Sequence, residues 1–317
     1  MAGVTDTVFR QLAKEHGADV MVTEFVSAEG IFRRNERTLE YLEFELAERP
    51  LGVQLFGADP ENLGEAARLV IEWKKPDFID LNFGCPVNKV VSKNGGSSLL
   101  RDCPLLEKIA RSVVTACAPV PVTAKIRIGW SAETVNAPVT ARILEDAGIA
   151  AVAVHGRTKE QGYSGVADWD VIAQTAAAVR IPVIGNGDLT SAGDVASRMS
   201  TGVRGVMLGR AAMSAPWIFA EIKHFLATGE LLPPPPLEAQ WAHIRRHCAL
   251  HVARRGDEAA AMHSMRSRLM AYSRGMPDAK ALRARFSHVG MLAELDDIAA
   301  ENLARTAETA LATATAG

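Results

Sequence analysis

The residue of this 317-residue chain with the clearest chemical potential is a cysteine in a turned loop. Cys85 lies in the segment Asp80-Leu81-Asn82-Phe83-Gly84-Cys85-Pro86, whose apolar beginning predicts a β-strand. A cysteine taken alone is more often an inert core residue than a reactive one. Here the flanking glycine and proline fix a turn, in which a thiol is accessible to a ligand. The same loop continues with positive charge and permissive backbone at Lys89, Lys93 and residues 94–97.

Two further strand ends carry cationic or polar side chains. Lys125 and Arg127 end the predicted strand 122–128, where the two-residue period places them on the same side. His155 and Arg157 follow the next predicted strand. Taken alone, Lys125 and Arg127 are equally explained as a solvated pair, and a lone histidine is more often structural. Their interpretation therefore depends on the fold that brings them together.

Glycine-rich turns follow the last two predicted strands, at Gly185-Asn186-Gly187-Asp188 and at Gly209-Arg210. Exposed backbone N–H groups in such loops, with a short helix behind them, form the usual phosphate site of a (βα)8 barrel. The alternative is that tight turns need glycine for their dihedral angles. No G-x-G-x-x-G segment follows a strand, so a dinucleotide held on a Rossmann unit is not indicated.

The elements that position these residues alternate between strand and helix up to about residue 230, which predicts a parallel sheet. Seven strands are predicted, over residues 19–23, 50–56, 78–82, 122–128, 150–155, 182–185 and 205–208. Residues 1–6 have the pattern of a strand-to-helix loop with Thr5 or Asp6 as N-cap. We therefore predict an α/β fold, a (βα)8 TIM barrel whose first strand is missing at the N-terminus. A genuine seven-stranded open barrel is the alternative.

A second domain is predicted after four consecutive prolines at 233–236, because proline stops a helix and forms a stiff spacer. The predicted domains are a catalytic barrel over 1–232, a linker over 233–236 and a helical domain over 237–317. Apolar residues recur at helical spacing in the tail, which favours a packed core. They are Leu237, Trp241, Ile244, Cys248 and Val252, followed by Met262, Met265, Leu269, Tyr272 and Met276.

Composition excludes several classes of protein. Hydrophobic residues make up 48% and charged residues 23% of the chain, which is typical of a folded globular protein. The four cysteines form no CxxC pair, so neither a metal site nor a disulfide framework is predicted. No apolar run approaches the roughly 20 residues of a membrane span, and no signal peptide is evident. We expect a cytoplasmic protein without a membrane association or an obligate protein partner.

Five motifs together resemble the tRNA-dihydrouridine synthases, and most closely their bacterial B-type branch. They begin at Met1, Leu81, Lys125, His155 and Gly185, and they read MAGVTD, LNFGCP, KIRIGW, HGRT and GNGD. The resemblance spans the barrel and, more weakly, the tail. It implies an enzyme that holds FMN, takes hydride from NADPH and reduces the C5=C6 bond of uracil bases in tRNA.

The resemblance also implies roles for single residues. Cys85 matches the proton donor, and Asn82 and Arg127 match groups near the substrate base. The positions that match flavin contacts are Met1, Ala2, Gln54, Lys125, His155, Asn186, Gly187, Asp188, Gly209 and Arg210. The thiol suits its role chemically, because a group with a reference pKa near 8.5 is protonated at neutral pH yet acidic enough to protonate a developing enolate.

The tail distinguishes tRNA from a free pyrimidine as the substrate. Residues 237–288 contain ten Lys or Arg against four Asp or Glu, which suits RNA phosphates, although solvated helix faces explain the same excess. The candidate phosphate contacts are Arg245, Arg246, Arg254 and Arg255. A flavoenzyme acting on free pyrimidines, of the dihydroorotate or dihydropyrimidine dehydrogenase type, and a non-catalytic RNA-binding protein stay open as alternatives.

Overall fold

A computed structural model describes residues 3–34 and 36–315, and the chain divides into two compact units. The first unit runs up to Gly209 and includes Phe219–Gly229, whereas the second contains Arg210–Ile218 and the chain from Glu230 onward. The proline segment 233–236 is neither helix nor strand. Residues 210–218 thus belong to the helical unit although they precede the prolines, because helix α10 (Arg210–Ser214) contacts helix α13 (Glu258–Tyr272).

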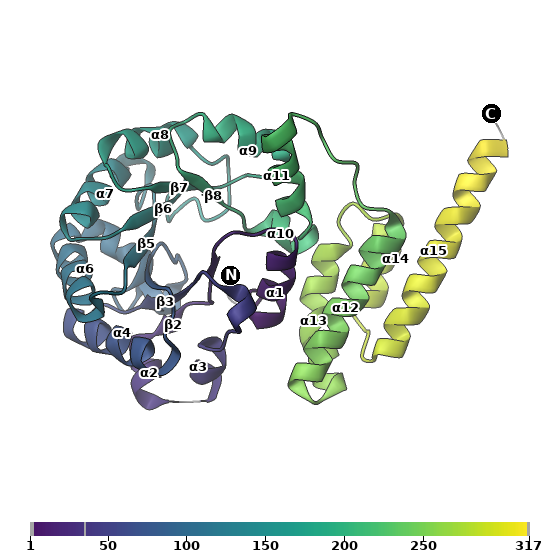
Figure 1. Ribbon diagram of the computed structural model, residues 1–317, viewed down its shortest axis with the longest axis horizontal. Coiled ribbons are helices and arrows are strands. Elements are labelled where there is room, and N and C mark those ends of the chain that lie inside the picture. The colour runs from purple at the N-terminus through teal and green to yellow at the C-terminus, as the bar shows by residue number, and fades with distance from the viewer. Residues whose placement is uncertain (1–2, 35, 316–317) are drawn as a thin grey trace. The chain divides into compact units, whose positions relative to one another are not determined.

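The first unit is built on a sheet of parallel strands (Figure 1). The strands are β1 (Met21–Val22), β2 (Val26–Ser27), β3 (Leu51–Phe56), β4 (Phe78–Phe83), β5 (Val122–Arg127), β6 (Ala151–His155), β7 (Val183–Asn186) and β8 (Gly205–Met207). Strands β1 and β2 both pair with β3, and each later strand pairs with the next in the chain. All seven predicted strands are confirmed, and β2 is an additional one.

The strand order is that of a (βα)8 TIM barrel, which confirms the predicted fold class. Within the described residues no ladder joins β8 to β1, so the sheet is not closed by backbone pairing. Two-residue strands such as β2 carry no periodicity, which is why sequence patterns miss them.

Helices follow the strands and surround the sheet in Figure 1. They are α1 (Thr7–Glu15), α2 (Ala28–Arg33), α3 (Glu36–Tyr41), α4 (Pro60–Lys74), α5 (Asn88–Val91), α6 (Cys103–Cys117), α7 (Ala137–Asp146), α8 (Trp169–Ala178), α9 (Ala192–Met199) and α11 (Ile218–Thr228), with 3-10 turns at Leu46–Glu48, Gly96–Arg101 and Ala132–Thr134. Aspartates cap the first turns of α1, α4, α6 and α8 by accepting backbone N–H bonds. Asp6 is the N-cap of α1, which confirms one of the two predicted caps.

Alternation along the strands separates an apolar face from a polar face. In β4, Asp80 and Asn82 alternate with fully buried isoleucine and leucine. The outer face packs closely on the helices at Gly185 of β7, where a Cβ would lie 2.4 Å from the Trp169 ring of α8. On the other face, the ladder register places Asn82 opposite Lys125 and Arg127 opposite His155. The fold therefore gathers the polar residues on the inner face of the sheet.

The second unit consists of helices packed on a core of their own. Besides α10 and α13 it contains α12 (Leu237–Arg255), α14 (Ala279–Phe286) and α15 (Leu292–Thr315). The predicted apolar stripes are confirmed as core, with Trp241, Cys248 and Met265 at most 1% exposed. Among the described residues, no helix of the chain has the length and hydropathy of a membrane span.

Candidate active site

Cys85 lies in the loop between β4 and α5, at the carboxyl end of the sheet. The Oδ1 atom of Asn82 accepts hydrogen bonds from the backbone amides of Gly84 (3.1 Å) and Cys85 (2.9 Å). On the other side, the Cys85 carbonyl accepts from the amide and the hydroxyl of Ser97 at 3.1 and 2.9 Å. The backbone that carries the thiol is therefore fixed from both ends of the loop.

The Cys85 thiol is held in its protonated form. Burial raises the pKa of Cys85, and this effect outweighs the backbone hydrogen bond from Val87 and the charge of Arg127 that oppose it. Burial also raises the pKa of Cys117 and Cys248 to about 12, so protonation alone does not distinguish the three thiols. What distinguishes Cys85 is its place in a loop at the carboxyl edge of the strands, where barrel active sites lie.

Lys125 is a half-buried cation at the same edge. Among the described residues, nothing forms a hydrogen bond or ion pair with its ammonium group. Burial lowers the pKa of Lys125 to about 8, the nearby charge of Arg127 adds to this effect, and Asp80 opposes it. An anionic group beside Lys125 would stabilise its charged form.

Arg127 ties two loops of the site together. Its guanidinium donates from Nε to the Gly84 carbonyl at 2.9 Å, and from Nη1 to the carbonyls of Thr158 (2.8 Å) and Gly162 (3.0 Å). The side chain is only 3% exposed, so it is not one of a solvated pair. Arg127 joins the loop that carries the thiol to the loop that follows β6.

His155 is buried next to three cations and stays neutral. Burial lowers the pKa of His155 to about 2, and the charges of Lys125, Arg127 and Arg157 act in the same direction. The imidazole therefore offers a neutral donor and a neutral acceptor throughout the physiological pH range.

The turn after β7 has a positive φ at Gly187, a conformation that glycine readily adopts. Gly187 has a φ of +128°, and a Cβ there would come within 2.6 Å of the Ala167 Cβ, so no larger residue fits. The next residue, Asp188, has a φ of 50° and accepts from Arg157 Nη2 (2.7 Å) and from the Ala167 amide (2.8 Å). Asn186 donates to the Met207 carbonyl at 2.7 Å, which links this turn to β8.

Asp80 was not predicted as a site residue, although it lies in the cysteine motif. Asp80 is 4% exposed and accepts hydrogen bonds from Thr123 Oγ1 (2.5 Å) and Gln54 Nε2 (2.6 Å). Gln54, expected to contact a flavin, also accepts from Asn82 Nδ2 at 2.7 Å. The signal was present as an acidic residue in a buried strand, which is unusual without a partner.

Four further residues were predicted as cofactor contacts. Met1 and Ala2 fall outside the described residues. Gly209 belongs to the first unit, and Arg210 is the exposed first residue of α10 in the second unit.

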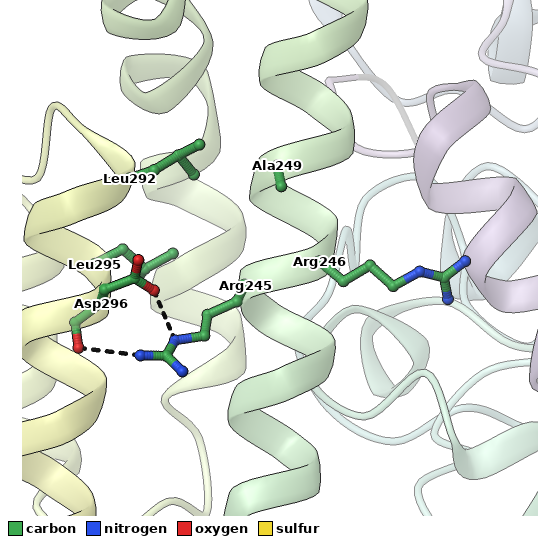
Figure 2. A pocket seen from close by; sticks show the side chains of 6 residues that line it. All are labelled: Arg245, Arg246, Ala249, Leu292, Leu295 and Asp296. Carbon is green, nitrogen blue, oxygen red and sulfur yellow. Dashed lines mark hydrogen bonds and ion pairs between the residues drawn. The ribbon is translucent and has the colours of Figure 1, made fainter.

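The four predicted phosphate contacts all lie on α12, and they are not equivalent. Arg245 pairs with Asp296 of α15 through Nε and Oδ1 at 2.8 Å, beside a pocket of about 280 Å³. Figure 2 shows that Arg246 points away from Asp296. Arg246, Arg254 and Arg255 are exposed, whereas Arg245 is only partly so.

Comparisons with known proteins identify the family of this chain. The family model described as dihydrouridine synthase (Dus) matches residues 1–311. The tRNA-dihydrouridine synthase B of Xanthomonas campestris pv. campestris is 47% identical over 238 residues, which are 75% of this chain and 71% of that protein. The tRNA-dihydrouridine synthase B of Pseudomonas putida is 41% identical over 289 residues, 90% of this chain and 85% of that protein. A probable tRNA-dihydrouridine synthase of Rickettsia bellii is 40% identical over 285 residues, covering 89% and 86%. The chain therefore belongs to the dihydrouridine synthase family, whose members are oxidoreductases that reduce uridine.

Proposed function

We propose that this protein is a tRNA-dihydrouridine synthase of the cytoplasm that uses FMN and NADPH, with Cys85 as the proton donor to the uracil base. The observation that carries the proposal is the place of Cys85, whose backbone is held by Asn82 and Ser97 at the edge of the sheet that also carries the half-buried Lys125. The names of the relatives, tRNA-dihydrouridine synthase B among them, support tRNA as the substrate.

The residues at this edge fit a flavin mononucleotide. Negative charge develops on the N1–C2=O edge of a reduced flavin, and the ammonium of Lys125 would neutralise that charge. No described residue forms an ion pair with this ammonium. The neutral ring of His155 and the left-handed turn at Gly187 add uncharged donors on the neighbouring strands. Gln54, Asn186 and Asp188 lie on the same edge, and Met1, Ala2, Gly209 and Arg210 are carried over from the family motifs.

The reaction adds a hydride to C6 and a proton to C5 of a uracil ring. When bound, FMN supplies the hydride, which NADPH has delivered to it. Cys85 gives its Sγ proton to C5, and the thiolate that remains takes a proton from solvent to complete the cycle. Asn82 and Arg127 both hold the Gly84–Cys85 peptide next to this thiol, so that it approaches the base in a fixed position.

We predict that FMN affinity decreases as the pH rises above about 8. The pKa of Lys125 is lowered to about 8 in the free protein, and a flavin carbonyl that accepts a hydrogen bond from its ammonium favours the charged form and raises this pKa. Below pH 8 the lysine is charged in both states and the affinity is flat. Above it, binding must take up a proton, so the Kd should increase by up to about tenfold per pH unit until the pKa of the complex is reached.

Quenching of FMN fluorescence between pH 7 and 9.5 measures this dependence, and Lys125→Met is the control. The pKa of His155 is far below this range, and Arg127 stays charged throughout it. The phosphate of FMN is already ionised. The methionine variant should bind more weakly at pH 7 and show no dependence on pH. An equal slope in both proteins would show that another group is responsible.

The second unit supplies the attraction to tRNA in this proposal. Its positive charge is concentrated on α12 to α14, where Arg246, Arg254 and Arg255 are exposed. Basic helical surfaces attract phosphates without regard to sequence, and the target base must leave its stack to reach a reductant in a barrel.

Two measurements test the proposed function. The purified protein should show the absorbance of bound flavin. With NADPH it should convert uridine to dihydrouridine in an unmodified tRNA transcript, as detected by mass spectrometry of the nucleosides. Equal reduction of free uracil or oxidation of dihydroorotate would instead identify an enzyme of free pyrimidines. A colourless protein that binds tRNA without modifying it would identify an RNA-binding protein.

A further inference from the structure

A buried carboxylate lies at the start of a chain of hydrogen bonds that ends at the reactive cysteine. Asp80 accepts from Thr123 Oγ1 at its Oδ1 atom and from Gln54 Nε2 at its Oδ2 atom. Burial raises the pKa of Asp80, whereas the hydrogen bonds from Thr123 and Gln54 and the charge of Lys125 favour the ionised form, which only accepts hydrogen bonds. Asp80 therefore determines which end of the Gln54 amide faces it, because only the NH2 end can donate.

The orientation of the Gln54 amide in turn determines that of the Asn82 amide. With its NH2 group on Asp80, Gln54 turns its Oε1 atom to Asn82 and accepts from Nδ2 at 2.7 Å. Asn82 must then present Oδ1 on its other side, where it accepts from the backbone amides of Gly84 and Cys85. A reversed Asn82 would place an NH2 group against two backbone N–H donors, and neither bond could form.

We propose that Asp80 is a positioning residue for the proton donor: by orienting Gln54 and, through it, Asn82, it fixes the backbone that carries the Cys85 thiol. The inference rests on the proposed function, in which Cys85 protonates the base. Asp80 itself touches neither the base nor the thiol, and its effect is transmitted by the two amides.

Burying Asp80, Gln54 and Asn82 together costs folding free energy. Asp80 is 4% exposed, Asn82 and Gln54 are 8% exposed, and the alternate positions of the same strands are apolar. Burying a carboxylate and two amides is less favourable than burying apolar side chains of similar volume, unless every donor and acceptor is matched. A matched network selects one orientation of each amide, which a purely apolar barrel interior would not do.

Three variants separate this role from the other effects of Asp80. Asp80→Ala removes both acceptors and the charge. Asp80→Asn also removes the charge, but its carboxamide oxygen can still accept from Gln54 while its NH2 group donates to the Thr123 hydroxyl. Any effect that acts through the charge of nearby Lys125 should appear equally in both variants. Thr123→Val deprives Asp80 of its other donor without interrupting the path to Cys85, so it controls for a loss of stability.

The rate at which the reduced enzyme is reoxidised, by tRNA or by oxygen, is the measurement. Oxygen needs no proton from Cys85, so its reaction controls for the state of the flavin. For tRNA we expect kcat of Asp80→Ala to fall about 100-fold relative to Asp80→Asn, with KM unchanged, because a small misplacement of a catalytic group has effects of this size. Thr123→Val should stay within a few-fold of wild type. Equal tRNA rates in Asp80→Ala and Asp80→Asn, or an equal loss in Thr123→Val, would overturn the inference.

A second measurement tests the inference without relying on the proposed function. Alkylation of Cys85 by iodoacetamide, followed by peptide mass spectrometry without tRNA, should change at least several-fold in Asp80→Ala and little in Asp80→Asn or Thr123→Val. If wild type forms no dihydrouridine but Cys85 reactivity follows this order, the proposed function fails and the positioning role of Asp80 stands. If wild type is active and Cys85 reactivity is the same in all variants, the positioning role fails.

Discussion

Replacing Cys85 by alanine is expected to stop dihydrouridine formation while FMN binding and flavin reduction by NADPH continue at wild-type rates. Only the protonation of C5 uses the thiol, and the loss of a general acid lowers a rate by about 10² to 10⁴-fold. Anaerobic reduction with NADPH followed by mixing with tRNA measures the two half-reactions separately. The first should be unchanged in the variant, and the second should be nearly absent.

The other cysteines provide matched controls. Cys117 is 2% exposed, and burial raises its pKa to about 12, so it is as fully protonated as Cys85 but lies at the end of helix α6. Cys103 is half-buried at the first residue of the same helix. Alanine at either position should affect stability at most. Turnover by Cys85→Ala equal to that of these controls would exclude Cys85 as the proton donor.

The predicted strands match the structure closely because buried parallel strands are continuous apolar runs bounded by turns. For example, 78–82 was predicted for β4 (Phe78–Phe83) and 150–155 for β6 (Ala151–His155). The sequence pattern could not place Val26–Ser27, since two residues form a strand only where a neighbouring ladder receives them. The assignment of residues 210–218 to the second unit could not be predicted either, because it depends on packing between α10 and α13 rather than on composition.

The candidate site was predictable where it depends on position along a strand. Alternation alone places Lys125 and Arg127 on the same side of their strand, and the register of the ladder then sets Lys125 opposite Asn82. It could not assign Arg127 to the carbonyls of Gly84 and Thr158, because those partners lie 43 and 31 residues away and the loops that carry them have no periodicity. The same holds for Asp80, whose partners come from two neighbouring strands.

The charge of the tail shows a further limit of counting residues along the chain. The excess of ten basic over four acidic residues holds for 237–288, but α15 adds five acids and only one arginine. Two of these acids pair with basic residues in the count, Asp296 with Arg245 and Glu301 with Arg285. Arg268, also in the count, is 5% exposed. The charge available to a polyanion is therefore smaller than the sequence suggests, and it lies on particular residues.

Neutralising the exposed arginines of α12 should weaken tRNA binding strongly without affecting flavin. We expect the triple change of Arg246, Arg254 and Arg255 to Gln to lower the salt slope of log K by about 2 to 3, since each phosphate contact contributes about 0.7 to 0.9. At 0.1 M salt this corresponds to a loss in affinity of up to about 10²- to 10³-fold. Arg245→Gln should have a smaller effect, because its guanidinium already pairs with Asp296. Titration of labelled tRNA at several salt concentrations measures both.

A triple variant of the first unit distinguishes the effect of the α12 surface on tRNA affinity from the effect of a change in net charge. Arg68 on α4, Arg111 on α6 and Arg180 after α8 are all more than half exposed, and their change to Gln removes the same three charges. If α12 carries the RNA surface, this control should keep most of the tRNA affinity and salt slope, whereas the α12 variant loses both and still reduces its flavin with NADPH. Equal losses in the two variants would mean that tRNA responds to total charge alone. Unchanged affinity in the α12 variant would mean that these arginines do not contact the phosphates.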